Sequence, residues 1–233
     1  MQLNLETKDL SLSGSLIFTN RTHWPAGVIS RGNMGLWGSL PGLECYSHVC
    51  VVDGAVRGQL TVNGDAVDFS GGSLYVEKNW GRSFPSRWFW AQCTDHGEQR
   101  VSFSCSVANV PLGPTDMTGF LLGLKVDDRF FPFTTANNSR LRLLHYRNGT
   151  LLEADRGPYR LTARVFPGSQ LTALKAPGQG RMVRKGFETL RGRVQLELWD
   201  LQEDCCLYHK TLDRCGVEYG GDWTPPYLRH AES

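Results

Sequence analysis

Arg100-Val101-Ser102-Phe103-Ser104-Cys105-Ser106-Val107 is the stretch of sequence that decides the fold. Apolar residues occupy the odd-numbered positions from 101 to 107, and serines lie between them. This period of two belongs to a β-strand with one apolar and one polar face. The alternation recurs at Leu161, Ala163 and Val165, and again over residues 194–198. No stretch of a dozen residues has helical spacing, so the sequence predicts an all-β protein.

Short turn signals separate the alternating runs. Asn-Gly and Asp-Gly pairs tolerate the positive φ angles of two-residue hairpin turns, and they occur at Asp53-Gly54, Asn63-Gly64 and Asn148-Gly149. Asp127-Asp128 is a weaker candidate. Many short strands at near-regular intervals are typical of a barrel or sandwich. Because a closed barrel removes exposed sheet edges and can enclose an apolar ligand, we predict an antiparallel β-barrel.

Composition excludes several classes of protein. The chain has 233 residues, and 25 Lys+Arg against 23 Asp+Glu leave a formal charge of +2, without the basic excess of a nucleic-acid binder. A hydrophobic content of 40% is enough for a packed core, which excludes a disordered chain. No apolar window could cross a bilayer and Met1 to Asp9 is no leader, so we expect a soluble chain without signal, transit or transmembrane segment.

We expect one β domain with short flanking segments: an N-terminal segment at 1–23, a barrel at 24–221 and an irregular C-terminal tail at 222–233. The seven cysteines are odd in number and irregularly spaced. Such a set is a poor disulfide framework, so we expect reduced thiols and a reducing compartment.

The residues best suited to chemistry concentrate between Tyr75 and Cys93, a stretch that holds three of the seven tryptophans. It reads as a strand, a turn at 81–85 and a second strand, and on the second strand Trp88, Trp90 and Gln92 share a face. Both faces are mixed, so the pattern leaves open which one looks inward.

Two interpretations of this stretch remain. In the first, the aromatic rings pack in a corner of the core and the charged groups pair around them. In the second, the stretch is a functional site, because carboxylates and ammonium groups are costly to bury among tryptophans unless they are paired.

The same stretch resembles the signature of the tocopherol cyclase family, a Glu-Lys-(Asn or Asp)-Trp-Gly block followed by Phe-Pro, Trp-x-Trp and Gln. A second match runs from Met34 to Tyr46, with a histidine at His48, and a weaker third one joins 176–178 through Glu188 to 216–220. The residues that match the first block are Glu77, Lys78, Asn79, Trp80, Gly81, Phe84, Pro85, Trp88, Trp90 and Gln92.

The resemblance covers roughly Trp24 to Gly221 and implies that the barrel is lipocalin-like. Family members usually carry a long N-terminal portion with a Gly-Trp-Tyr motif before the Met-Gly segment. That motif is absent here, which implies a partial sequence or a shortened relative.

Tocopherol cyclases close the chromanol ring of vitamin E by adding the phenol oxygen of a prenylated quinol across an alkene. The resemblance therefore implies an acid that protonates the alkene, for which Glu77 is our first choice and Glu44 the second, because aromatic surroundings disfavour a charged carboxylate. Trp80, Trp88 and Trp90 would stabilise the developing cation through their ring faces. The candidates that would bind the quinol are Tyr46, His48, Tyr75, Asn79 and Gln92.

The sequence predicts no metal and no cofactor, because its histidines lack ligand spacing and nucleotide-binding motifs are absent. The expected partner is an amphiphilic prenylquinol or another apolar small molecule, collected through peripheral contact with a membrane, and no nucleic acid is expected. A plastid location follows from the resemblance only. The alternatives are a non-catalytic lipocalin-like carrier of isoprenoid or other apolar ligands, and a hydratase or isomerase of a terpenoid double bond.

Overall fold

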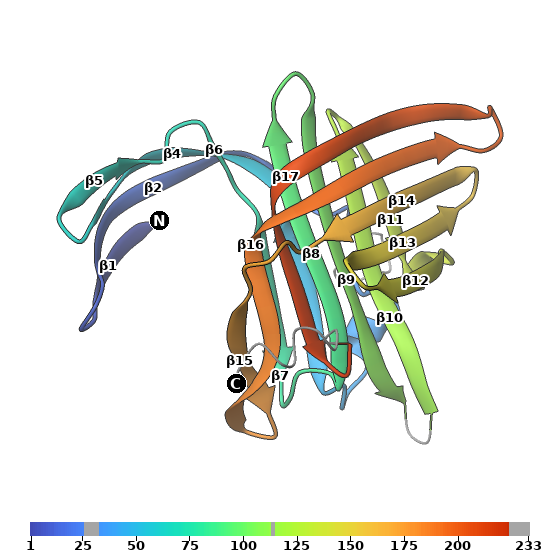
Figure 1. Ribbon diagram of the computed structural model, residues 1–233, viewed down its shortest axis with the longest axis horizontal. Coiled ribbons are helices and arrows are strands. Elements are labelled where there is room, and N and C mark those ends of the chain that lie inside the picture. Colours follow the sequence, from blue (N-terminus) through green and yellow to red (C-terminus); the bar gives the residue numbers. More distant parts are fainter. Residues whose placement is uncertain (26–32, 113–114, 224–233) are drawn as a thin grey trace. The chain divides into compact units, whose positions relative to one another are not determined.

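The computed structural model describes residues 1–25, 33–112 and 115–223 (Figure 1). Strands dominate this part of the chain, and its helical elements are the short 3-10 turns η1 (Gly35–Ser39) and η2 (Thr135–Asn137). The prediction of an all-β protein is confirmed. The chain divides into two compact units, Met1–Pro25 with Val49–Lys78 and Ala26–His48 with Asn79–Ser233. Residues 224–233, most of the predicted C-terminal tail, lie outside the described residues.

The first unit is a five-stranded antiparallel sheet in the order β1-β2-β4-β5, with β6 also paired to β4. Leu16, Val56 and Leu60 are buried on one side of it. The predicted Asn63-Gly64 turn is confirmed, since both residues have positive φ between β4 and β5. The strands are β1 (Gln2–Glu6), β2 (Ser11–Thr22), β4 (Asp53–Val62), β5 (Asp65–Asp68) and β6 (Gly72–Ser73).

The predicted turn at Asp53-Gly54 is wrong. Asp53 is fully buried and begins β4, where it pairs with Thr22 of β2. A Cβ added at Gly54 would lie 3.2 Å from the side chain of Leu74, so the glycine here permits close packing instead of a turn. The run before it, β3 (Cys45–Val51), pairs with β7 (Val76–Gly81) in a two-stranded sheet.

The second unit contains a ten-stranded antiparallel sheet in the order β11-β10-β9-β8-β17-β16-β14-β13-β12, with β15 paired to β16. β17 therefore lies between β8 and β16. The strands are β8 (Arg87–His96), β9 (Arg100–Leu112), β10 (Thr115–Val126), β11 (Arg129–Thr134), β12 (Arg140–Tyr146), β13 (Gly149–Arg156), β14 (Tyr159–Phe166), β15 (Thr172–Gly178), β16 (Arg181–Asp200) and β17 (Cys205–Gly221).

Two predicted turns fall in this sheet. Asp127-Asp128 joins β10 to β11 as expected. The turn predicted at Asn148-Gly149 is displaced by one residue, because Gly149 already pairs with Tyr146 as the first residue of β13. A Cβ at Gly149 would lie 2.2 Å from the carbonyl oxygen of Val165, so close approach of β14 requires this glycine.

One buried cluster forms the core of the second unit, and the predicted alternating runs all contribute to it. Val101, Phe103 and Val107 are fully buried, as are the apolar residues of 161–165. The sheet curls around this core, because strands from its two ends meet. Arg156 on β13 donates to the carbonyl oxygen of Pro132 on β11 at 3.1 Å, and the rings of Phe131 and Tyr159 pack edge to face at 5.3 Å.

The long strand β16 bends as it crosses the unit (Figure 1). Its first part pairs with β15 and its second part with β14. The register against β17 shifts on both sides of Gly192, as at a β-bulge, which bends a strand and increases its twist. One strand thus contributes to two different parts of the sheet.

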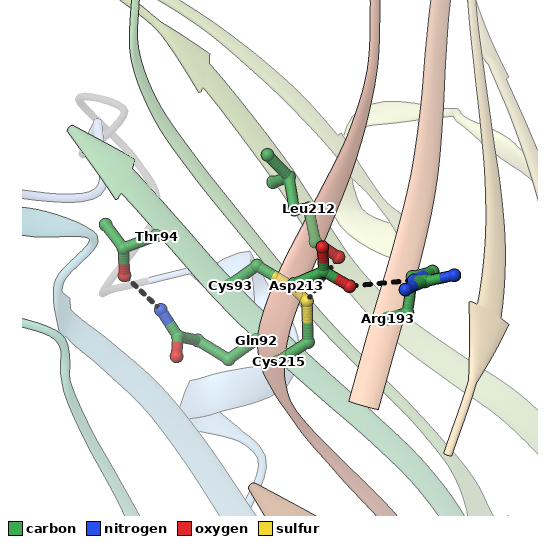
Figure 2. Close-up of a disulfide and its surroundings, with 7 residues drawn as sticks. All are labelled: Gln92, Cys93, Thr94, Arg193, Leu212, Asp213 and Cys215. Atoms are coloured by element: carbon green, nitrogen blue, oxygen red, sulfur yellow. Dashed lines mark hydrogen bonds and ion pairs between the residues drawn. A yellow bond between two sulfur atoms is a disulfide. The ribbon is translucent and has the colours of Figure 1, made fainter. Parts of the chain in front are cut away.

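The expectation of reduced thiols is wrong for one pair of cysteines. Cys93 on β8 and Cys215 on β17 form a disulfide with a sequence separation of 122 residues (Figure 2). The two strands are neighbours in the sheet, and both cysteines point into the core. The spacing of cysteines in the sequence does not reveal such a pairing, because the two residues become neighbours through the order of the strands in the sheet and are far apart along the chain.

Candidate active site

Strand β8 places its two sets of side chains on opposite faces of the sheet. Phe89, Ala91 and Cys93 belong to the buried core. Since alternate residues of a strand point to opposite faces, Trp88, Trp90 and Gln92 lie on the other face, which resolves the orientation left open by the sequence. Gln92 donates from Nε2 to the Thr94 hydroxyl at 2.8 Å (Figure 2).

The neighbouring strand β17 has a matching pattern. Gly220 pairs with Trp88, Glu218 with Trp90 and Gly216 with Gln92, so two glycines flank a carboxyl group beneath the indole rings. A Cβ at Gly220 would lie 2.1 Å from atoms of the Trp88 ring, and one at Gly216 would lie 2.8 Å from Trp90. The glycines therefore make room for both rings to lie on the backbone of β17.

Trp88 is fixed on three sides. Its Nε1–H donates to Oε1 of Glu218 at 2.6 Å, and its ring meets that of Phe84 edge to face at 5.4 Å. A Cβ at Gly186 of β16 would also come within 3.1 Å of the ring. Only 6% of Trp88 is exposed, so this indole is a rigid, largely desolvated wall.

Glu188 of β16 lies directly opposite Glu218 in the strand register. Directly opposed residues of an antiparallel pair have Cβ atoms about 5 Å apart, which places the two glutamates next to each other on the face of the sheet that carries Trp88. Both residues are half-buried. Burial raises the pKa of Glu188 above its ordinary value, because desolvation penalises the charged form.

We call Phe84, Trp88, Trp90, Glu188 and Glu218 the indole–carboxyl cluster. A half-buried acid with a raised pKa, opposite a second glutamate and next to an aromatic wall, is suited to proton transfer in a weakly hydrated setting. Sequence reasoning singled out Trp88 and Trp90 but not the two glutamates as acids. The available signal was the Gly-x-Glu-x-Gly alternation of β17, which places both glycines and the glutamate on one face.

A second group of predicted residues gathers around Trp80 in the same unit. The rings of Tyr46 and Trp80 stack at 5.5 Å, and the Tyr46 hydroxyl donates to the carbonyl oxygen of Leu40 at 2.8 Å. The side chain of Glu44 is exposed, and its backbone oxygen accepts the amide of Arg82 at 2.9 Å. A Cβ at Gly81 would lie 2.0 Å from that same oxygen, which explains the glycine.

The remaining predicted residues have local contacts. In the first unit, the Tyr75 hydroxyl donates to Oε2 of the half-buried Glu77 at 2.7 Å. In the second unit, Nδ1 of His48 lies 2.8 Å from Oδ1 of the buried Asn33. Asn79 is exposed on β7.

Within residues 1–25, 33–112 and 115–223, no three or more His, Cys, Asp or Glu side chains are grouped so that they could hold a metal ion. In the same ranges, none of the helices has the length and apolar character needed to span a bilayer.

A family model described as tocopherol cyclase-like matches residues 19–221, which include every residue of the indole–carboxyl cluster. The chain belongs to the tocopherol cyclase-like family. It is 24% identical over 196 residues to "Tocopherol cyclase, chloroplastic" of Zea mays, across 80% of this chain and 41% of that protein. It is 23% identical over 200 residues to "Probable tocopherol cyclase, chloroplastic" of Oryza sativa subsp. japonica, across 82% of this chain and 43% of that protein.

This tocopherol cyclase-like chain thus spans about two fifths of the length of these curated relatives. No solved structure is significantly similar to it. The family match ends at Gly221, the last residue of β17, so the strand that carries Glu218 lies within the family domain.

Replacing Gly220 by alanine should displace Trp88 and destabilise the second unit by about 1–3 kcal/mol, because the new Cβ overlaps the indole ring. Urea unfolding followed by tryptophan fluorescence measures both effects. Gly97→Ala is the matched control, since a Cβ there would meet its nearest atom at 3.5 Å, and it should change stability by no more than about 0.5 kcal/mol. A Gly220→Ala variant as stable as Gly97→Ala, with unchanged fluorescence, would contradict the packing described.

Proposed function

We propose that this chain catalyses ring closure of a prenylated hydroquinone to a chromanol, as the names of its relatives suggest. The phenol oxygen adds across the nearest alkene of the prenyl tail, so substrate and product are isomers. The observation that carries the proposal is the indole–carboxyl cluster, in which a half-buried acid lies opposite a second glutamate and next to an aromatic wall inside the family domain.

Glu188 is the proposed general acid. An alkene is a weak base, so the acid must be protonated at working pH, and the raised pKa of Glu188 favours that state. Its carboxylic proton goes to the alkene carbon, and the neighbouring tertiary carbon becomes cationic. The phenol oxygen then bonds to that carbon, and Glu218, oriented by the indole N–H of Trp88, takes the phenol proton.

Trp88 and Trp90 are proposed to stabilise the cation through their ring faces. Such contacts contribute about 0.5–2 kcal/mol each where water is excluded, or about a tenfold to thirtyfold rate effect at most per ring. Proton transfer and orientation of the quinol must supply the larger share of the acceleration. Cation stabilisation by Trp88 and Trp90 and proton transfer to Glu218 both require that β8 and β17 hold these side chains in place.

The candidates chosen from sequence remain part of the proposal in other roles. The half-buried Tyr46 and the exposed Trp80 form a stacked aromatic pair that would hold the quinol ring, and His48, Asn79 and Gln92 would bind its hydroxyl groups. Glu77 and Glu44 remain competing acids, although Glu77 already accepts the Tyr75 hydroxyl and the Glu44 side chain is exposed. A plastid location, as in the relatives' names, and catalysis without metal or cofactor belong to the same proposal.

A product assay in heavy water tests this function. The purified chain is incubated with a prenylated hydroquinone in D2O, and the products are separated and analysed by mass spectrometry. Acid-initiated closure should give an isomer with a single non-exchangeable deuterium at the carbon that receives the proton. Binding without product supports a lipocalin-like carrier, and a product that has gained water supports a hydratase; either result overturns the cyclase proposal.

A further inference from the structure

The β15–β16 hairpin has an excess of positive charge. The paired part of this hairpin runs from Thr172 to Glu188 and holds four basic residues and one acidic residue, Glu188, which lies at the end furthest from the turn. The whole chain has a net charge of only +2. The basic residues of the hairpin are Lys175, Arg181, Arg184 and Lys185.

The tip of this hairpin is tightly built. Gln179 and Gly180 form its two-residue turn with φ angles of 48° and 80°, and Gly178 pairs directly with Arg181. Positive φ at both central residues matches the turn type that fits the twist of two-stranded hairpins. The backbone of the tip therefore has a defined conformation and register.

Two large apolar side chains are exposed next to this turn. Met182 is 61% exposed and Val183 is 40% exposed, and as neighbours on one strand they point to opposite faces of the hairpin. Single exposed apolar residues are common on protein surfaces. Here, two adjacent ones lie at a turn beside Arg181, which is also exposed.

The same hairpin is joined to the candidate active site close to its tip, because Pro177 lies directly opposite Met182. The carbonyl oxygen of Pro177 accepts the backbone N–H of Phe84 at 2.8 Å, and Phe84 packs on Trp88. Further along β16, Glu188 lies six residues from Met182, about 20 Å along an extended strand. The hairpin thus connects an exposed apolar and basic tip to the indole–carboxyl cluster.

We propose that the tip of the β15–β16 hairpin docks on an anionic lipid surface. Basic side chains are attracted to anionic headgroups, and apolar side chains gain free energy by entering the boundary between headgroups and acyl chains. A nucleic acid would interact favourably with the basic side chains but would gain nothing from the exposed Met182 and Val183. The presence of basic and exposed apolar side chains at one tip therefore favours a lipid surface. The proposal concerns binding and holds whether or not the chain is a cyclase.

Vesicle co-flotation of the full chain tests the proposal. We compare phosphatidylcholine vesicles with vesicles in which about a third of the lipid is phosphatidylglycerol. The wild type should float with the anionic vesicles only, and added salt should weaken this binding. Arg181→Ala should weaken it about fivefold, and Met182→Asp on the order of tenfold, because the latter removes an apolar group and adds a negative charge.

Leu201→Asp is the matched control, since Leu201 is 48% exposed at the turn between β16 and β17. It should bind vesicles like the wild type, and circular dichroism should confirm that all variants are folded. Three results would overturn the proposal: equal binding of wild type and Met182→Asp, an equal loss in Leu201→Asp, or equal binding to neutral and anionic vesicles. A change of oligomeric state in Met182→Asp without a change in flotation would instead identify a contact between copies, and would also reject lipid docking.

Discussion

Replacing Glu188 by glutamine should lower kcat for ring closure by about 10²- to 10⁴-fold, the usual contribution of a positioned general acid. Glutamine has nearly the same shape but carries no acidic proton. The substitution should not destabilise the fold near neutral pH. Burial disfavours ionisation of Glu188 in the folded protein, so its contribution to stability falls as pH rises, and glutamine removes that loss.

The pH dependence of kcat gives a second readout. Because the pKa of Glu188 is raised, the protonated acid persists to higher pH than an ordinary glutamic acid would, and kcat should fall as pH rises through that pKa. Glu188→Gln should remove this limb of the profile along with most of the activity. A substitution that merely disturbed packing would lower kcat without changing the shape of the profile.

Three matched glutamine variants identify the acid without ambiguity. Glu77→Gln and Glu44→Gln should retain most of the activity, whereas Glu218→Gln should slow turnover by removing the acceptor of the phenol proton. If Glu77→Gln or Glu44→Gln abolishes turnover and Glu188→Gln does not, the acid is one of the residues chosen from sequence. The assignment of Glu188 is then wrong, although the ring closure itself is not.

Removing the Cys93–Cys215 disulfide should lower the free energy of unfolding by about 5 kcal/mol in the chain-entropy model, because the bond closes a loop of more than a hundred residues. The bond also joins β8 and β17, whose other faces carry Trp88, Trp90 and Glu218. The indole–carboxyl cluster should therefore lose order as stability falls.

The measurement is urea unfolding of the wild type, with and without a reductant, and of the double variant Cys93→Ala/Cys215→Ala. Reductant should destabilise the wild type and leave the double variant unchanged. Cys105→Ala controls for truncation of a buried cysteine, since Cys105 is 1% exposed and lies outside the disulfide. The disulfide would be contradicted if the wild type titrated as seven free thiols and its free energy of unfolding did not change with reductant.

Much of the fold could be predicted from local pattern. Alternation over 101–107 and 161–165 identified strands and their buried faces, because a period of two is a direct consequence of strand geometry. Turn signals were less dependable. Asp53-Gly54 and Gly149 have the composition of a turn, yet both glycines serve close packing against side chains or backbone that are distant in sequence.

The candidate site was only partly predictable. Trp88 and Trp90 could be identified from their setting, but the proposed acid, Glu188, comes from β16 and Glu218 comes from β17, and only strand order brings these residues together. The disulfide escaped prediction for the same reason. Local sequence defines what each strand can contribute, and long-range pairing decides which contributions meet.

The position of β17 has a consequence for biosynthesis. This strand leaves the ribosome after all the others of its sheet, yet it fills the gap between β8 and β16. Until it arrives, both neighbours present unpaired backbone edges, which are templates for association with other chains. Co-translational folding of the sheet therefore cannot finish before residue 221 has emerged, and a nascent chain halted earlier should need a chaperone to remain unaggregated.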